Sequence, residues 1–183
     1  MNTAPRRAHN FNHRFKEEIK MKIRRFAIAA ITLLLCASTA FAIDAKTSFA
    51  NLKSLTGTWQ GQGSDGKPVQ VSYRLTAGGS ALMSEIQGMH EDMITMFHMD
   101  GDRLLMTHYC AVGNQPRMVA TASPDGKVIT FDFLDATNLS SPTAGHMGRL
   151  VLTMVDADHH TEEWDFAGDG KEMKEVFDLH RAK

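Results

Sequence analysis

Short turn signals recur along most of this chain and limit the folds it can adopt. Clusters of Gly, Asp, Asn and Pro are followed each time by a segment of strand length. The turn signals are 63–66, 77–79, 100–102, 113–116, 124–126, 156–158 and 168–170. The strand-length segments are 57–63, 68–76, 81–88, 92–99, 102–110, 117–123, 127–133, 146–155, 160–166 and 172–180. Serial strands joined by short turns are typical of antiparallel up-and-down barrels.

Alternating apolar residues within these segments indicate strands with one buried face. One such set comprises Val69, Val71, Tyr73 and Leu75, and another comprises Ile129, Phe131 and Phe133. We therefore expect an all-β fold, an up-and-down barrel of about 8–10 strands. The longer connection 134–145 is a candidate lid or capping loop.

One short helix is expected before the strands. Phe49, Leu52 and Leu55 recur at three-residue spacing behind Thr47, which we predict as the N-cap, and Gly57 would stop the helix. The expected fold is thus a barrel with one short N-terminal helix.

The segment Met21–Ala42 has the pattern of a secretory signal peptide. Basic residues precede an apolar run at 26–35, and small residues lead to Ala40-Phe41-Ala42, an A-x-A cleavage site. Residues 1–20 are then a mis-assigned start or an extended basic region. We expect cleavage after Ala42 and a single periplasmic or secreted domain at 43–183, with no stable membrane insertion after cleavage.

The charge of residues 43–183 narrows the possible partners. This range contains twelve Lys and Arg residues and nineteen Asp and Glu residues, so its formal net charge is −7 with neutral histidines. Nucleic acids and anionic membranes select basic surfaces, so neither is an expected partner. Only Cys110 remains after cleavage, so no intramolecular disulfide can form. We expect a monomer or a weak dimer.

Motifs of enzyme chemistry are weak here. Residues 61–66 match G-x-G-x-x-G, but Lys67-Pro68 and a strand follow instead of a helix, which indicates a hairpin turn. The sequence has no H-E-x-x-H, P-loop or G-x-S-x-G motif. We interpret the run His159–Glu163 as a solvated turn and strand edge. A binding protein is therefore expected rather than an enzyme.

Several short motifs resemble the calycin superfamily, which includes lipocalins, fatty-acid-binding proteins and nitrobindin-like haem proteins. A short helix followed by Gly57-Thr58-Trp59 looks like the Gly-x-Trp signature of that superfamily. The resemblance implies that Trp59 closes one barrel end against a basic side chain from the last strand, where Arg181 stands. The chain is also similar to exported bacterial lipocalin-like proteins of unassigned function. The shared motifs are Gly57–Trp59, Asp100–Leu104, His108–Cys110 and Asn114–Arg117.

The segment around His108 is the best candidate for a ligand site, and the alternative is that His108 is a core or rim histidine bonded to backbone, with Arg117 a rim cation that only completes a turn. In a strand, Leu104, Met106, His108 and Cys110 share one face. If that face points inward, His108 and Cys110 lie at a strand end near the 113–117 turn. The hairpin would set Met93 or Asp92 opposite His108, depending on loop length. The candidate ligand-binding residues of this segment are His108, Tyr109, Cys110, Asn114 and Arg117.

Methionines supply the second part of the predicted site. Their flexible thioethers suit a deformable apolar cavity, although they also fill gaps in ordinary cores. The predicted lining residues are Met83, Met96, Met106, Met154, Ile129 and Phe131. A barrel of this size can hold one small ligand or fill itself with side chains.

We therefore expect an exported barrel that binds a small apolar molecule without a cofactor. The alternative is a haem or zinc protein that uses His108, either alone or with His146 as a second ligand. A third hypothesis is a non-catalytic structural or interaction module. An enzyme with His108 as acid or base, and Tyr109 or Arg117 stabilising charge, ranks below these.

Overall fold

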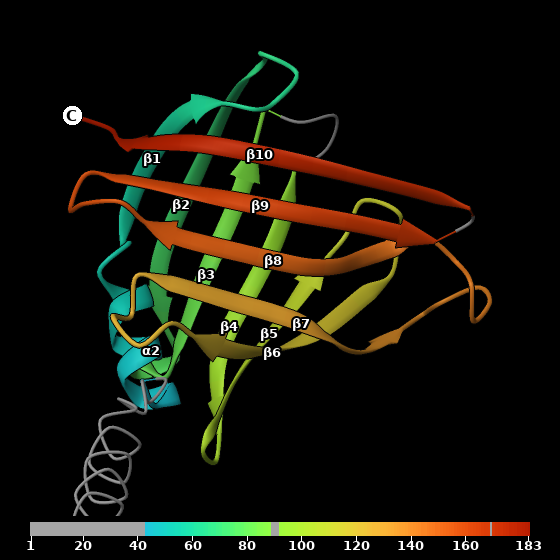
Figure 1. The fold of residues 1–183 in the computed structure, drawn as a ribbon, viewed down its shortest axis with the longest axis horizontal. Helices are drawn as coiled ribbons and strands as arrows, with labels where there is room; N and C mark the ends of the chain where they lie inside the picture. Colours follow the sequence, from blue (N-terminus) through green and yellow to red (C-terminus); the bar gives the residue numbers. More distant parts are fainter. Residues whose placement is uncertain (1–42, 89–91, 169) are drawn as a thin grey trace, which may run out of the picture. The chain divides into compact units, whose positions relative to one another are not determined.

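Ten antiparallel strands close into one barrel (Figure 1). The computed structural model describes residues 43–88, 92–168 and 170–183. Each strand pairs with its neighbours in sequence, and β1 pairs with β10. The strands are β1 (Gly57–Gln62), β2 (Pro68–Thr76), β3 (Ala81–Gln87), β4 (Met93–Asp100), β5 (Arg103–Tyr109), β6 (Gln115–Ala122), β7 (Val128–Thr137), β8 (His146–Met154), β9 (His159–Gly168) and β10 (Lys171–Arg181). A single 3-10 turn, η1 (Ala77–Gly79), joins β2 to β3. The predicted all-β up-and-down barrel is confirmed.

Helix α2 (Ala45–Lys53) precedes β1 and contacts β4, β5 and β6 at one end of the barrel (Figure 1). Its N-cap is Asp44, whose Oδ1 accepts the Thr47 N–H at 2.7 Å. The prediction that Thr47 caps the helix is wrong, because the backbone is extended at Asp44 and already helical at Thr47. Phe49 and Leu52 are buried in the barrel core, so α2 covers this end. Among the described residues, no helix has the length and hydropathy needed to cross a membrane.

An apolar core fills the barrel, and it consists of the side chains that point inward at alternate positions along the strands. Many of them are fully buried, which leaves no water-sized space beside them. The core residues on the strands include Trp59, Val71, Tyr73, Leu82, Phe97, Met106, Met118, Phe131, Leu152, Trp164 and Phe177. Phe133 continues the alternation of Ile129 and Phe131 but is 38% exposed, next to a register irregularity between β6 and β7. It lies near the barrel end opposite α2.

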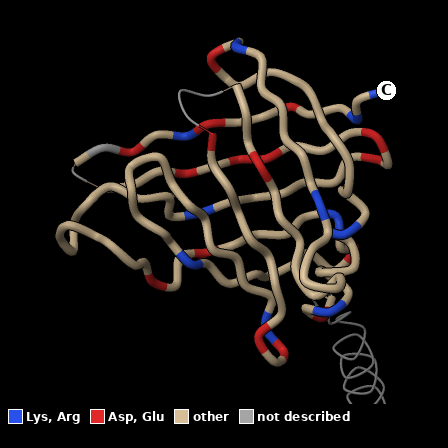
Figure 2. The backbone as a smooth tube through the Cα atoms, turned by 180° about the vertical axis from the view of Figure 1, so that it is seen from behind, with Lys and Arg blue, Asp and Glu red and all other residues tan. Residues whose placement is uncertain are grey.

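The outer surface carries scattered charges. Figure 2 shows acidic positions on strands and turns, with basic positions dispersed among them. Residues 1–42 lie outside the described residues, so the signal peptide, the cleavage after Ala42 and the alternative start stay predictions.

Candidate ligand site inside the barrel

His108 points into the barrel from β5 and is fully buried. Its Nδ1 lies 2.9 Å from Thr95 Oγ1, and its ring centroid lies 4.8 Å from that of Trp164. Its Nε2 has no hydrogen-bond partner among the described residues. Burial lowers the pKa of His108 to about 4, although the nearby Glu162 carboxylate acts in the opposite direction. The imidazole is therefore neutral at pH 7.

The strand opposite His108 is in a different register from the one expected. Met93 and Asp92 were the predicted partners, but β4 and β5 pair Thr95 with His108. The hairpin pairs Asp100 with Arg103, so the loop consists of the two residues between them, and Gly101 takes a left-handed conformation with φ of 63°. A loop displaced by one position along the chain changes the whole register, which is why this prediction is wrong.

A buried carboxylate lies in the same interior. Glu162, on β9, is 1% exposed. Its Oε1 accepts the Tyr73 hydroxyl at 2.5 Å, and its Oε2 accepts the Trp164 indole N–H at 2.9 Å. His160 Nε2 lies 3.4 Å from the same Oε1. Burial, followed by the charge of Glu162, raises the pKa of Tyr73 well above its ordinary value, so Tyr73 stays a hydrogen-bond donor.

His160 completes this group, which we call the buried polar cluster: Tyr73, Thr95, His108, His160, Glu162 and Trp164. The His160 ring is fully buried, with its centroid 4.3 Å from that of Trp59 in an edge-to-face arrangement. Its Nδ1 has no hydrogen-bond partner among the described residues. The interpretation of His159–Glu163 as a solvated edge is wrong for His160 and Glu162, because β9 begins at His159 and its even-numbered residues face inward.

Sequence reasoning missed Tyr73, His160, Glu162 and Trp164 as members of a site. The signal that could have found them is the two-residue spacing of His160, Glu162 and Trp164. In one continuous strand that spacing places all three on the same face. The turn signal at 156–158 instead favoured a solvated segment, which is correct only for the outward-facing residues of the run His159–Glu163.

Other residues of the predicted His108 segment point away from the interior. Tyr109 is 50% exposed, and Arg117 forms a surface ion pair with Asp135. Arg117 pairs across the sheet with Thr107, so both lie on the outer face. The prediction that Tyr109 and Arg117 act beside His108 is therefore wrong, both for ligand binding and for acid–base chemistry.

Cys110 and Asn114 lie in the turn after β5. The Cys110 N–H donates to the Asn114 carbonyl at 3.1 Å, and burial raises the pKa of the Cys110 thiol. The buried Asn114 side chain donates from Nδ2 to the Gly145 carbonyl at 2.8 Å, while its Oδ1 has no partner among the described residues. A cleft of about 400 Å³ lies here, between this turn, the loop 138–145 and Phe166.

His146 stands at the same end of the barrel as that cleft but does not contact His108 in any described interaction. Its Nδ1 lies 2.8 Å from the Ala144 carbonyl, and its ring centroid is 4.4 Å from that of Phe133. The described interactions therefore do not bring His146 and His108 together.

The residues predicted to line an apolar cavity divide between the inner and outer faces of the barrel wall. Met106 is fully buried with Ile129 and Phe131, and Met154 packs against the core. Met83 and Met96 are cross-strand partners whose neighbours Leu82, Ser84, Thr95 and Phe97 are the buried ones. Because strand neighbours point to opposite faces, Met83 and Met96 lie outside, and the prediction that they line the interior is wrong.

Trp59 and Arg181 meet at the barrel end that α2 covers. Trp59 is fully buried and donates its indole N–H to the Leu55 carbonyl at 2.7 Å. The Arg181 guanidinium lies 4.2 Å from the centre of the Trp59 ring. Gly57 has φ of 129°, and a Cβ there would lie 3.1 Å from Arg181 Nη1, so the site favours glycine. Arg181 also bonds Ser54 O, Thr56 O, Ala157 O and Asp158 Oδ1.

Burial of His108 should make the fold less stable in mild acid. An unfolded histidine titrates near pH 6.5, whereas folded His108 titrates at about 4, so the unfolded chain binds more protons between these values. The stability of the fold with neutral His108 is fully present above about pH 6.5. Up to roughly 3 kcal/mol of the free energy of unfolding is lost as the pH falls towards about 4. Urea unfolding of wild type and His108→Gln across this range measures it. A difference between the two proteins that does not vary with pH would contradict the assignment.

The fold and the site together define a class of protein: a closed antiparallel barrel, compatible with a lipocalin-like or calycin-like fold, that holds a polar cluster in its core. No protein-family model matches the chain, and no curated protein matches it significantly.

Proposed function

We propose that this protein is an exported calycin-like barrel that binds a small, mainly apolar molecule carrying one neutral polar group. The observation that carries the proposal is the buried polar cluster, in which His108 Nε2 and His160 Nδ1 lack partners among the described residues. The protein would act as a monomer or weak dimer, with neither nucleic acid nor membrane as a partner.

The energetics of burial support recognition over simple packing. A buried polar atom without a hydrogen bond costs about 1–3 kcal/mol, and a buried carboxylate needs several donors to offset its desolvation. Apolar side chains of similar volume would fill a barrel core at least as stably. A ligand that bonds the two unpartnered imidazole nitrogens would remove that cost. Ligand recognition therefore accounts for a polar cluster that core packing alone does not need.

The charges of the cluster select the polar group of the ligand. Glu162 receives O–H and N–H donors from Tyr73 and Trp164, an arrangement that suits a carboxylate. His108 is neutral at pH 7 and offers either a donor or an acceptor at Nε2. An anionic head group would meet the Glu162 charge without a compensating cation. A hydroxyl or carbonyl group would not, so the proposed ligand is an alcohol, ketone or similar neutral molecule.

Access to the cluster is expected from the end opposite α2. Helix α2, Trp59 and Arg181 occupy one end, whereas the cleft beside Asn114 lies at the other. Asn114 lines that cleft, and its buried Oδ1 has no hydrogen-bond partner among the described residues. Since the interior side chains are packed, binding requires them to shift, and the flexible Met106 and Met118 suit such a change.

A haem or zinc protein is the second candidate, supported by the open Nε2 of His108, which is a typical ligand atom. The contacts around it favour the small molecule instead. The Trp164 ring packs against His108, and His146 is bonded to Ala144 at the barrel end. A structural or interaction module is the third candidate.

The proposal is tested by displacement of N-phenyl-1-naphthylamine, a neutral fluorescent probe, from the full chain. Decan-1-ol should displace the probe at a concentration at least tenfold lower than decanoate does, because only decanoate brings a second negative charge near Glu162. His108→Leu should weaken decan-1-ol binding several-fold, since one hydrogen bond contributes about 0.5–1.5 kcal/mol. Arg117→Ala, from the outer face, is the control and should bind as wild type does.

Each alternative has its own signature in the same experiment. A Soret band on addition of haemin that disappears in His108→Leu would favour the haem protein. Absence of binding by the probe and both decane derivatives would favour the structural module. Equal displacement by decan-1-ol in wild type and His108→Leu would remove His108 from the site.

A further inference from the structure

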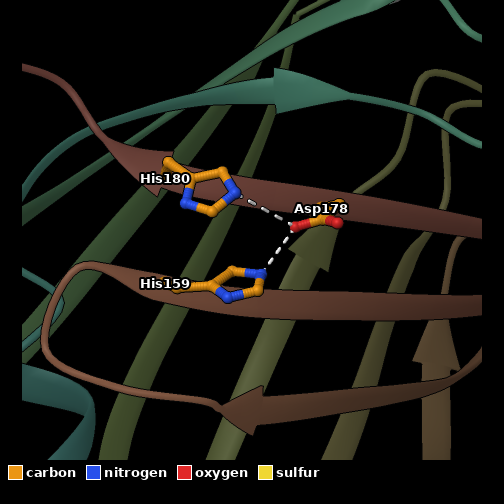
Figure 3. A group of neighbouring side chains, drawn as sticks. All are labelled: His159, Asp178 and His180. Atoms are coloured by element: carbon orange, nitrogen blue, oxygen red, sulfur yellow. Dashed lines mark hydrogen bonds and ion pairs between the residues drawn. The ribbon is translucent and has the colours of Figure 1, made fainter.

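Two histidines and an aspartate converge on the outer surface where β9 and β10 run side by side (Figure 3). His159 Nε2 lies 2.7 Å from Asp178 Oδ1, and His180 Nε2 lies 3.7 Å from the same oxygen. The two imidazole rings are stacked, with centroids 4.2 Å apart and planes at 20°. One ligand atom from each residue lies within 4.8 Å of the others.

Strand register produces this arrangement. His159 and His180 are direct partners in the antiparallel pairing of β9 and β10. Asp178 precedes His180 by two residues, so it shares the same face, whereas Leu179 and His160 between them point into the core. All three side chains are thus directed outward from two paired strands. About 64% of the His180 side chain and 63% of Asp178 are exposed, whereas His159 is 25% exposed.

Among the described residues, no lysine or arginine balances the charge of Asp178. The ion pairs of Asp178 among the described residues are both with histidines, and no described lysine or arginine pairs with it. The carboxylate is therefore available to a divalent cation. Exposed carboxylates alone would attract such ions weakly, but two adjacent imidazoles add nitrogen ligands of defined direction.

We propose that His159, Asp178 and His180 form a surface site for a divalent transition-metal ion, with Zn²⁺ as the reference ion. Two imidazole nitrogens and one carboxylate oxygen suit Zn²⁺, Ni²⁺ or Cu²⁺, whereas Mg²⁺ and Ca²⁺ select oxygen ligands. Three protein ligands leave at least one coordination position for water or for a group from another molecule. The site lies on the outside of the barrel and is separate from the buried polar cluster.

The present spacing is close to what a metal requires. Tetrahedral Zn²⁺ with bonds of about 2.0–2.2 Å holds neighbouring ligand atoms about 3.3–3.6 Å apart. The two separations from Asp178 Oδ1, 2.7 and 3.7 Å, bracket that value, and the three ligand atoms all lie within 4.8 Å of one another. Small rotations of the side chains would bring the atoms to the spacing of a bound ion.

Calorimetric titration of the full, untagged chain after treatment with a chelator tests the site. We expect one Zn²⁺ per chain, with binding unaffected by a large excess of Mg²⁺. His159→Ala, His180→Ala and Asp178→Asn should each raise the Kd for Zn²⁺ at least tenfold. Imidazole NMR signals of His159 and His180 should shift when Zn²⁺ is added.

Matched controls separate this site from general binding. His98→Ala, on β4, and Asp132→Asn, on β7, should leave the Kd for Zn²⁺ unchanged. His108→Leu should also leave it unchanged, which keeps the result independent of the interior ligand. A wild-type Kd in His159→Ala and His180→Ala, or loss of Zn²⁺ binding in His108→Leu, would overturn the proposal, as would absence of Zn²⁺ binding to the wild type.

Discussion

Replacing Trp59 with alanine should lower the free energy of unfolding by about 3–5 kcal/mol. The indole is fully buried, its N–H bonds the Leu55 carbonyl, and Arg181 and His160 pack against it from two directions. Its loss leaves a cavity at the barrel end, together with an unpaired carbonyl. Urea unfolding followed by circular dichroism measures the change.

Tyr109→Ala is the matched aromatic control, because Tyr109 is half exposed on the outer face. It should change stability little. Trp164 does not serve as an outer-face control, since it is 3% exposed and its indole N–H donates to Glu162. Equal small effects of Trp59→Ala and Tyr109→Ala would contradict the role of Trp59 in closing the barrel.

The second large effect is expected for Glu162→Ala, about 3–5 kcal/mol of lost stability. The change removes the shared acceptor of Tyr73 and Trp164, so their buried O–H and N–H groups lose their partners. Each unpaired buried donor costs about 1–3 kcal/mol, and the cavity adds to this. The same urea experiment gives the value.

Glu163→Ala provides the control for that change, because Glu163 is the next residue on β9 but points outward to an ion pair with Lys174. A surface ion pair contributes little, so this variant should unfold close to wild type. If Glu162→Ala and Glu163→Ala destabilised the protein equally, the buried polar cluster would not exist as described.

Local sequence signals were sufficient to predict the strands. The ten expected segments match the ten observed strands, most with ends displaced by one or two residues. The largest difference is β7, which continues to Thr137 where the sequence suggested a loop from residue 134. Gly, Asp and Pro clusters mark turns because of their backbone preferences, whereas the far end of a strand depends on the partner that continues the ladder.

The sequence predicted only part of the candidate site, and the parts that it predicted and missed differ for a physical reason. Strand alternation placed His108 and Met106 correctly on one face, because the side-chain period depends only on the local backbone. Arg117 and Tyr109 were grouped with them by proximity in sequence, although alternation directs them outward.

What the sequence determined by itself was the serial order of short strands, the helix before them and, through parity, that His108 and Met106 share one face. The tertiary structure decided that this face points inward. Only the tertiary structure decided that His108, Tyr73 and Glu162, from three separate strands, share one interior. It also decided that His159 and His180 are cross-strand partners. Closure and register are long-range properties: a loop displaced by one residue changes every cross-strand pair while leaving the local pattern of each strand intact.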